Sequence, residues 1–140
     1  MMNRKGFTLI ELMVVIFIVG ILAAVAIPIM RGRIDAAKWS EGKSAMGSIR
    51  TAARSLIAEK GNSYTYAGHN NLTTDLGFAA GDLDGKYFTT ACYAIAFTDV
   101  AGSSPTYVIT CTAASSTSTD KPASPTKVTL DQTGLFTETP

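Results

Sequence analysis

One long apolar segment near the N-terminus constrains this chain more than any other feature. Within residues 7–30 the only polar side chains are Thr8 and Glu11, and residues 12–27 contain none. Twenty-four helical residues rise about 36 Å, which exceeds the roughly 30 Å hydrocarbon thickness of a bilayer. The sequence therefore predicts a membrane-spanning helix over residues 7–30.

The residues that flank and interrupt this segment bear on its orientation and fate. Arg4 and Lys5 precede it, which predicts a cytoplasmic N-terminus by the positive-inside rule. One alternative is a conventional secretory signal cut after Ala26, which would release a secreted soluble binding domain. Glu11 argues against that alternative, because a carboxylate at membrane depth costs about 2.5–3.5 kcal/mol and is seldom retained without a partner or purpose.

The residues around Glu11 resemble the processing signal of the type IV prepilins. The string Lys5-Gly6-Phe7-Thr8-Leu9-Ile10-Glu11 matches that signal, and Pro28 falls where pilins usually carry a helix-kinking proline. The resemblance is strong over residues 5–30 and weak beyond about residue 60. It implies that prepilin peptidase removes a leader of residues 1–6 by cutting after Gly6. It also implies that Phe7 becomes an N-methylated mature N-terminus, with Glu11 as the acidic residue at its fifth position.

The resemblance further implies a structural, non-enzymatic subunit that forms a homo-oligomeric, helical, extracellular pilus. Before assembly the chain would be a single-pass protein of the inner membrane, where the peptidase and the assembly machinery would be its partners. No cofactor and no direct nucleic-acid partner is expected. A major pseudopilin of a type II secretion system is the alternative within the same superfamily. The shared stem leaves adhesion, motility and DNA uptake equally open as roles.

Four residues of the apolar segment are predicted to serve assembly. Cleavage would create an α-amine at Phe7, and the Glu11 carboxylate of a neighbouring copy could pair with it. Gly20 and Ala24 form a small-xxx-small pair that lets helices approach closely. Pro28 is an expected bend in the helix. The predicted assembly residues are therefore Glu11, Gly20, Ala24 and Pro28.

Residues 31–60 continue the helical pattern as an amphipathic half. A glycine after Lys60 predicts the helix end there, and Trp39 is expected to pack against the head. Gly42 is one of several expected soft points. This half carries a local charge of +4, from seven basic and three acidic residues, whereas residues 61–140 carry −4, from three basic and seven acidic residues. The predicted apolar stripe consists of Ala45, Ile49, Ala52 and Leu56.

Residues 61–140 predict a globular head with a small antiparallel sheet, which places the chain in the α+β class. A connecting loop is expected up to residue 88, followed by strands over 92–98, 106–111 and 127–132. Pairing about Ala101/Gly102 would put Cys92 opposite Cys111 and Ile95 opposite Val108, which predicts a Cys92–Cys111 disulfide. The Ser/Thr-rich residues 112–119 are expected to form a solvated loop, with O-glycosylation as a second interpretation.

The sequence offers little chemistry beyond this. Two cysteines and one histidine cannot complete a four-ligand zinc site. Asp82 and Asp84, with Asp75, are the one candidate calcium cluster. They lack the remaining carboxylates of an EF-hand loop. An acidic turn is the simpler interpretation, so no metal site is expected.

Overall fold

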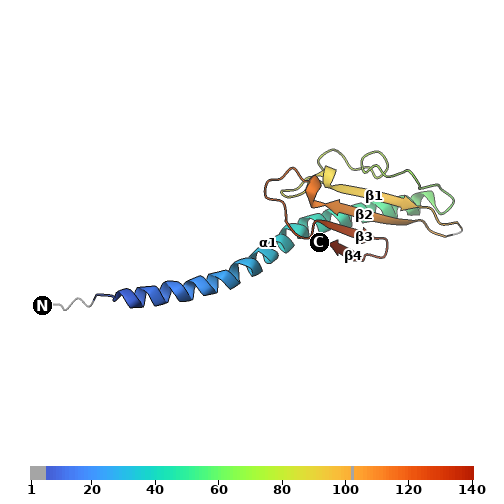
Figure 1. Ribbon diagram of the computed structural model, residues 1–140. Coiled ribbons are helices and arrows are strands. Elements are labelled where there is room, and N and C mark those ends of the chain that lie inside the picture. The colour runs from blue at the N-terminus through green and yellow to red at the C-terminus, as the bar shows by residue number, and fades with distance from the viewer. Residues whose placement is uncertain (1–5, 102) are drawn as a thin grey trace. The chain divides into compact units, whose positions relative to one another are not determined.

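The computed structural model describes residues 6–101 and 103–140 and shows an α+β architecture (Figure 1). Residues 1–5 of the predicted leader and Gly102 of the predicted turn lie outside the described residues. The chain divides into two compact units, Met1–Ile34 and Asp35–Pro140. The helix is α1 (Leu9–Lys60), followed by the short 3₁₀ helix η1 (Thr90–Cys92), strands β1 (Tyr93–Thr98) and β2 (Thr106–Thr112), the 3₁₀ helix η2 (Ala113–Ser115), and strands β3 (Lys127–Asp131) and β4 (Phe136–Thr139).

The part of α1 in the first unit is apolar and exposed. It includes an 18-residue window with a mean hydropathy of 3.1, of which none is buried, so α1 is long and apolar enough to cross a membrane. The large apolar side chains of residues 7–30 are all at least 50% exposed, with Phe7 at 88%. Pro28 lies inside α1 without ending the helix. Residues 7–30 are hereafter called the stem.

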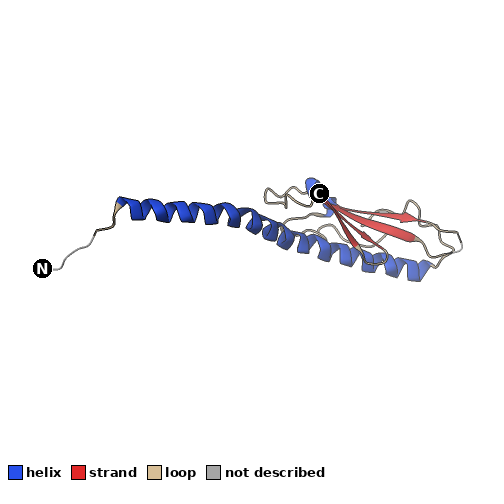
Figure 2. Ribbon diagram, turned by 60° about the horizontal axis from the view of Figure 1, so that its bottom comes forward, coloured by secondary structure: helices blue, strands red, loops and turns tan. Residues whose placement is uncertain are grey.

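The second unit packs the remainder of α1 against a four-stranded antiparallel sheet in the order β1-β2-β3-β4 (Figure 2). The three predicted strands are confirmed to within a residue or two, but β4 was not predicted. It pairs with β3 through a tight turn in which Asp131 Oδ1 accepts hydrogen bonds from the N–H groups of Thr133, Gly134 and Leu135. Gly134 has φ of +97°, a conformation that favours glycine.

The predicted register of the first hairpin is wrong by one residue. Tyr93, not Cys92, pairs with Cys111, and Ile95 pairs with Ile109 rather than with Val108. A one-residue slip would turn every side chain to the opposite face. The observed register buries Ile95 and Ile109 together toward α1 and leaves Val108 43% exposed. Burial of the larger apolar set therefore decides the pairing.

The two cysteines are buried and free in the structure, so the predicted disulfide is not present there. Cys92 lies in η1, just before the strand, whereas Cys111 lies within β2. Burial raises the pKa of the Cys111 thiol to about 12. With this pKa a free Cys111 thiol is protonated at ordinary pH.

The buried face of α1, which packs on the sheet, is shifted around the helix from the predicted apolar stripe. Trp39 is confirmed as a core residue at 1% exposure, and its ring centroid lies 4.8 Å from that of Phe88. Gly42 is buried rather than a soft point, because a Cβ there would lie 3.2 Å from the Phe88 ring. Of the predicted stripe only Ile49 is fully buried. The buried residues of α1 are Lys38, Trp39, Gly42, Met46, Ile49 and Ala53.

Residues of α1 also fix the loop between β2 and β3. Trp39 Nε1 donates to the Pro125 carbonyl at 2.9 Å, and Lys38 Nζ lies 2.7 Å from Asp120 Oδ1. The Lys38 ammonium holds the pKa of the Asp120 carboxyl below its usual range. The Ser/Thr-rich first part of this loop is not all solvated as predicted, since Ser116 is 6% exposed and its hydroxyl donates to the Tyr87 carbonyl.

Glu41 of α1 holds the end of the long connecting loop. Its carboxylate accepts hydrogen bonds from the backbone N–H groups of Lys86, Tyr87 and Phe88 at 3.0, 2.8 and 3.0 Å. A Cβ on Gly85 would collide with this carboxylate. Any larger residue at position 85 would therefore displace the Glu41 carboxylate from its place beside the loop.

Glu41→Ala is expected to destabilise the second unit by about 3 kcal/mol, because three backbone N–H groups lose a charged acceptor. Denaturant unfolding in detergent micelles, followed by fluorescence of the single tryptophan Trp39, measures this. The matched control is Glu59→Ala on the same helix, where the carboxylate bonds only to exposed Lys60. Equal stability of the two variants would show that the Glu41 hydrogen bonds contribute nothing.

Candidate functional site

The helix start is built by a reciprocal pair of side chains, Thr8 and Glu11. Because α1 begins at Leu9, Thr8 is its N-cap and Glu11 its third residue. Glu11 Oε2 accepts from the Thr8 N–H at 2.8 Å and from the Thr8 hydroxyl at 2.7 Å, while the Glu11 N–H donates to Thr8 Oγ1 at 3.3 Å. This is a capping box, which satisfies two backbone donors at once. Its signature, Thr followed three residues later by Glu, was present in the sequence and was missed.

The capping box gives Glu11 a role within its own chain. A carboxylate in the first turn also lies at the favourable end of the helix dipole. Gly6 and Phe7 precede the helix in irregular backbone, so the predicted cleavage bond lies outside α1. Among the described residues Glu11 forms no ion pair, and the predicted pairing with a neighbour's Phe7 amine stays a prediction.

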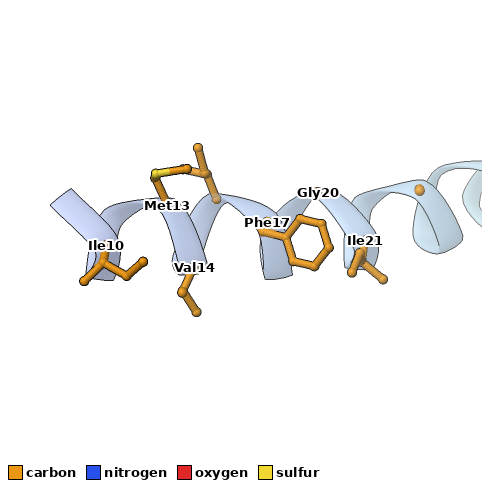
Figure 3. A pocket seen from close by; sticks show the side chains of 8 residues that line it. Ile10, Met13, Val14, Phe17, Gly20 and Ile21 are labelled. Atoms are coloured by element: carbon orange, nitrogen blue, oxygen red, sulfur yellow. The ribbon is translucent and has the colours of Figure 1, made fainter.

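An apolar groove of about 720 Å³ runs along one side of the stem (Figure 3). A Cβ added to Gly20 would meet no atom within 4 Å, so this glycine does not serve packing inside its own chain. With no side chain at that position, the helix backbone is open to a close neighbour. The groove is lined by Ile10, Met13, Val14, Ile16, Phe17, Gly20, Ile21 and Ala24.

The predicted assembly residues do not share one groove. Gly20 and Ala24 line the groove just described, whereas Glu11 lines a second one of about 360 Å³ with Phe7, Ile10, Val14 and Val15. Pro28 lines neither of these two grooves. The residues that carry charge and those that permit close approach are thus separated along the stem.

The aspartates of the candidate calcium cluster are used within the loop instead. Within residues 6–101 and 103–140, no three histidine, cysteine, aspartate or glutamate side chains gather closely enough to hold a metal ion. Hydrogen bonds to Asn71 and Thr90 hold the pKa values of Asp75 and Asp84 below their usual range. Asp75, Asp82 and Asp84 accept from the backbone N–H groups of Asn71, Ala79 and Thr90, respectively.

Known proteins resemble this chain most clearly at its N-terminus. Residues 1–27 match the family model described as the prokaryotic N-terminal methylation motif. The chain is 46% identical over 61 residues to the fimbrial protein EcpB of Eikenella corrodens, which covers 44% of this chain and 38% of the relative. It is 40% identical over 77 residues to the type IV major pilin protein PilA of Myxococcus xanthus. That match covers 55% of this chain and 32% of the relative. The chain is therefore similar to type IV pilins over part of its length.

The similarity of this chain to its relatives is partial. A fimbrial protein of Pseudomonas aeruginosa is 39% identical over 83 residues, 59% of this chain and 54% of the relative. The matches to these relatives thus span between about a third and just over half of their length. No solved structure matches the chain significantly.

Proposed function

We propose that this chain is the structural subunit of a type IV pilus and assembles through its stem into a helical extracellular filament. The observation that carries the proposal is the exposure of the stem, whose large apolar side chains are all at least half exposed. Such a surface is stable in a bilayer or against an equal apolar surface. Other copies of the stem supply that surface outside the membrane.

In this proposal the chain meets the membrane, the peptidase and the assembly machinery one after another. The stem first crosses the inner membrane with its N-terminus in the cytoplasm, where prepilin peptidase removes residues 1–6. Inner-membrane assembly machinery then transfers the subunit into the filament. The names of the relatives, fimbrial protein and type IV major pilin protein, support a pilus rather than a pseudopilus. They also support a structural role rather than an enzymatic one.

Processing after Gly6 gives the first test of the proposal. The native protein is expected to begin at Phe7 with an N-methyl group, and Edman sequencing together with intact mass measures both. Replacing Gly6 by a bulky residue should leave an uncut precursor in the membrane, whereas the same change at Gly61, outside the motif, should leave processing unchanged. A native chain that begins at Ile27 would establish the secretory alternative instead.

A further inference from the structure

The second unit contains a polar groove that the assembly stem does not explain. It has a volume of about 350 Å³, which is near the small end of the range for small-molecule pockets, roughly 300–1,000 Å³. α1, the loop before β1, and β1 itself contribute to it. Its lining residues are Glu41, Ser44, Ala45, Ser48, Phe78, Asp82, Leu83, Asp84, Gly85 and Tyr93.

The carboxylates of this groove are held in place by backbone donors. Thr90 donates its N–H and its hydroxyl to Asp84 Oδ1 at 2.6 and 2.9 Å, which lowers the pKa of Asp84. Asp84 Oδ2 accepts no hydrogen bond from the residues that the structure describes. Asp82 is exposed and uses Oδ2 for the Ala79 N–H. The groove is therefore a fixed anionic surface that disfavours an anionic ligand.

The hydroxyl of Tyr93 is a second, independent indication of a ligand. Tyr93 is 6% exposed and lines the groove, yet its hydroxyl oxygen is buried without a hydrogen-bond partner among the described residues. A buried hydroxyl without a partner is destabilising. Buried polar groups nearly always find a partner. Among the described residues Arg50 Nε and the Tyr107 hydroxyl are also buried without one, but neither residue lines the groove.

We propose that this groove binds an alkylammonium group, such as the end of a lysine side chain. The ammonium would donate hydrogen bonds to the Tyr93 hydroxyl and to the free carboxylate oxygens of Asp82 and Asp84, while its alkyl stem lies against Phe78 and Leu83. A metal ion does not fit, because these carboxylates do not gather as metal ligands within the described residues.

Charge favours a second copy of this chain as the source of the ammonium group. Residues 31–60 carry a local charge of +4 and residues 61–140 carry −4, so heads and basic helix segments of different copies attract one another. The chain's own Lys86 does not line the groove. Its Nζ instead lies 5.1 Å from the centroid of the Tyr87 ring. A free diamine presents the same chemistry and serves as a probe.

The binding test uses the full chain, labelled with ¹⁵N in detergent micelles and titrated with 1,5-diaminopentane. We expect saturable chemical-shift changes at Ser44, Asp84 and Tyr93, and no such changes with uncharged 1,5-pentanediol. Tyr93→Phe should weaken binding about tenfold, because one hydrogen bond to a charged donor is lost. Tyr107→Phe, which removes a buried tyrosine hydroxyl outside the groove, is the matched control and should bind as the unmodified chain does.

A second arm identifies the source. If a second copy supplies the ammonium group, the same resonances should shift as the protein concentration rises without diamine, and added diamine should reverse the shift. Shifts with diamine alone would instead assign the groove to a free amine, which also supports the alkylammonium site. Equal binding of pentanediol, or unchanged affinity in both Tyr93→Phe and Asp82→Asn, would overturn the proposal. Neither outcome depends on whether filaments form.

Discussion

Full-length protein moved from detergent into buffer is expected to form filaments or aggregates and not to remain monomeric. Fully burying one large apolar side chain contributes about 1.5–3 kcal/mol. Summed over the stem, even after a heavy discount, exposure to water costs some tens of kcal/mol, which exceeds the net stability of an ordinary domain, about 5–15 kcal/mol. The exposed stem therefore has to be covered, and another copy offers an equal surface.

The matched control for this prediction removes the stem and keeps the second unit. A chain that starts at Asp35 retains the carboxylate that accepts hydrogen bonds from the Ala123 and Ser124 N–H groups. We expect this fragment to be soluble and monomeric, and unable to join filaments. Light scattering coupled to size-exclusion chromatography compares the two proteins. A full-length chain that stays monodisperse and monomeric without lipid or detergent would refute the filament proposal.

Glu11→Leu is expected to reduce the filament yield at least about tenfold while the monomer remains anchored in the membrane. Removing a carboxylate from the apolar segment lowers the cost of insertion by about 2.5–3.5 kcal/mol. The same change removes the predicted partner of a neighbour's Phe7 amine, and an unpaired buried charge is strongly destabilising, by about 3–5 kcal/mol. Counting sheared filaments and membrane-bound monomer in the same cells measures both effects.

The capping box allows the charge of Glu11 to be separated from its hydrogen bonds. Glu11→Gln removes the charge but keeps an acceptor for the Thr8 N–H, because glutamine also serves in a capping box. Thr8→Val removes the cap hydroxyl and keeps the carboxylate. If the charge pair drives assembly, Glu11→Gln loses filaments and Thr8→Val retains most of them. The reverse pattern would show that Glu11 acts only by starting the helix.

The sequence predicted the helix and the stem well because their signals are local. An apolar run of this length has few folded solutions, and Lys60-Gly61 ends the helix where predicted. The capping box was equally local, but the resemblance drew attention to Glu11 as an intermolecular group. The strand β4 followed a readable Asp-x-x-Gly turn at Asp131, which was overlooked.

The register and the loop contacts depend on long-range packing and could not be obtained in the same way. The positions of the turn and of the cysteines predicted one strand pairing. The observed pairing differs because it buries Ile95 and Ile109 together. In the sequence, Glu41 looks like one charge on a solvated helix face. In the structure its carboxylate accepts hydrogen bonds from three backbone N–H groups some 45 residues away in sequence. Such contacts appear only once the loop is placed on the helix.

The contacts between α1 and the C-terminal third of the chain also bear on mechanical strength. Lys38, Lys43 and Arg50 bond to Asp120, Glu138 and the Gln132 carbonyl, respectively. These three attachments lie at successive levels of the helix, about 18 Å from first to last by helical rise. They join the helix to the loop before β3, to the turn between β3 and β4, and to β4 itself. Lifting the whole C-terminal part of the chain away from α1 therefore requires all three attachments to break.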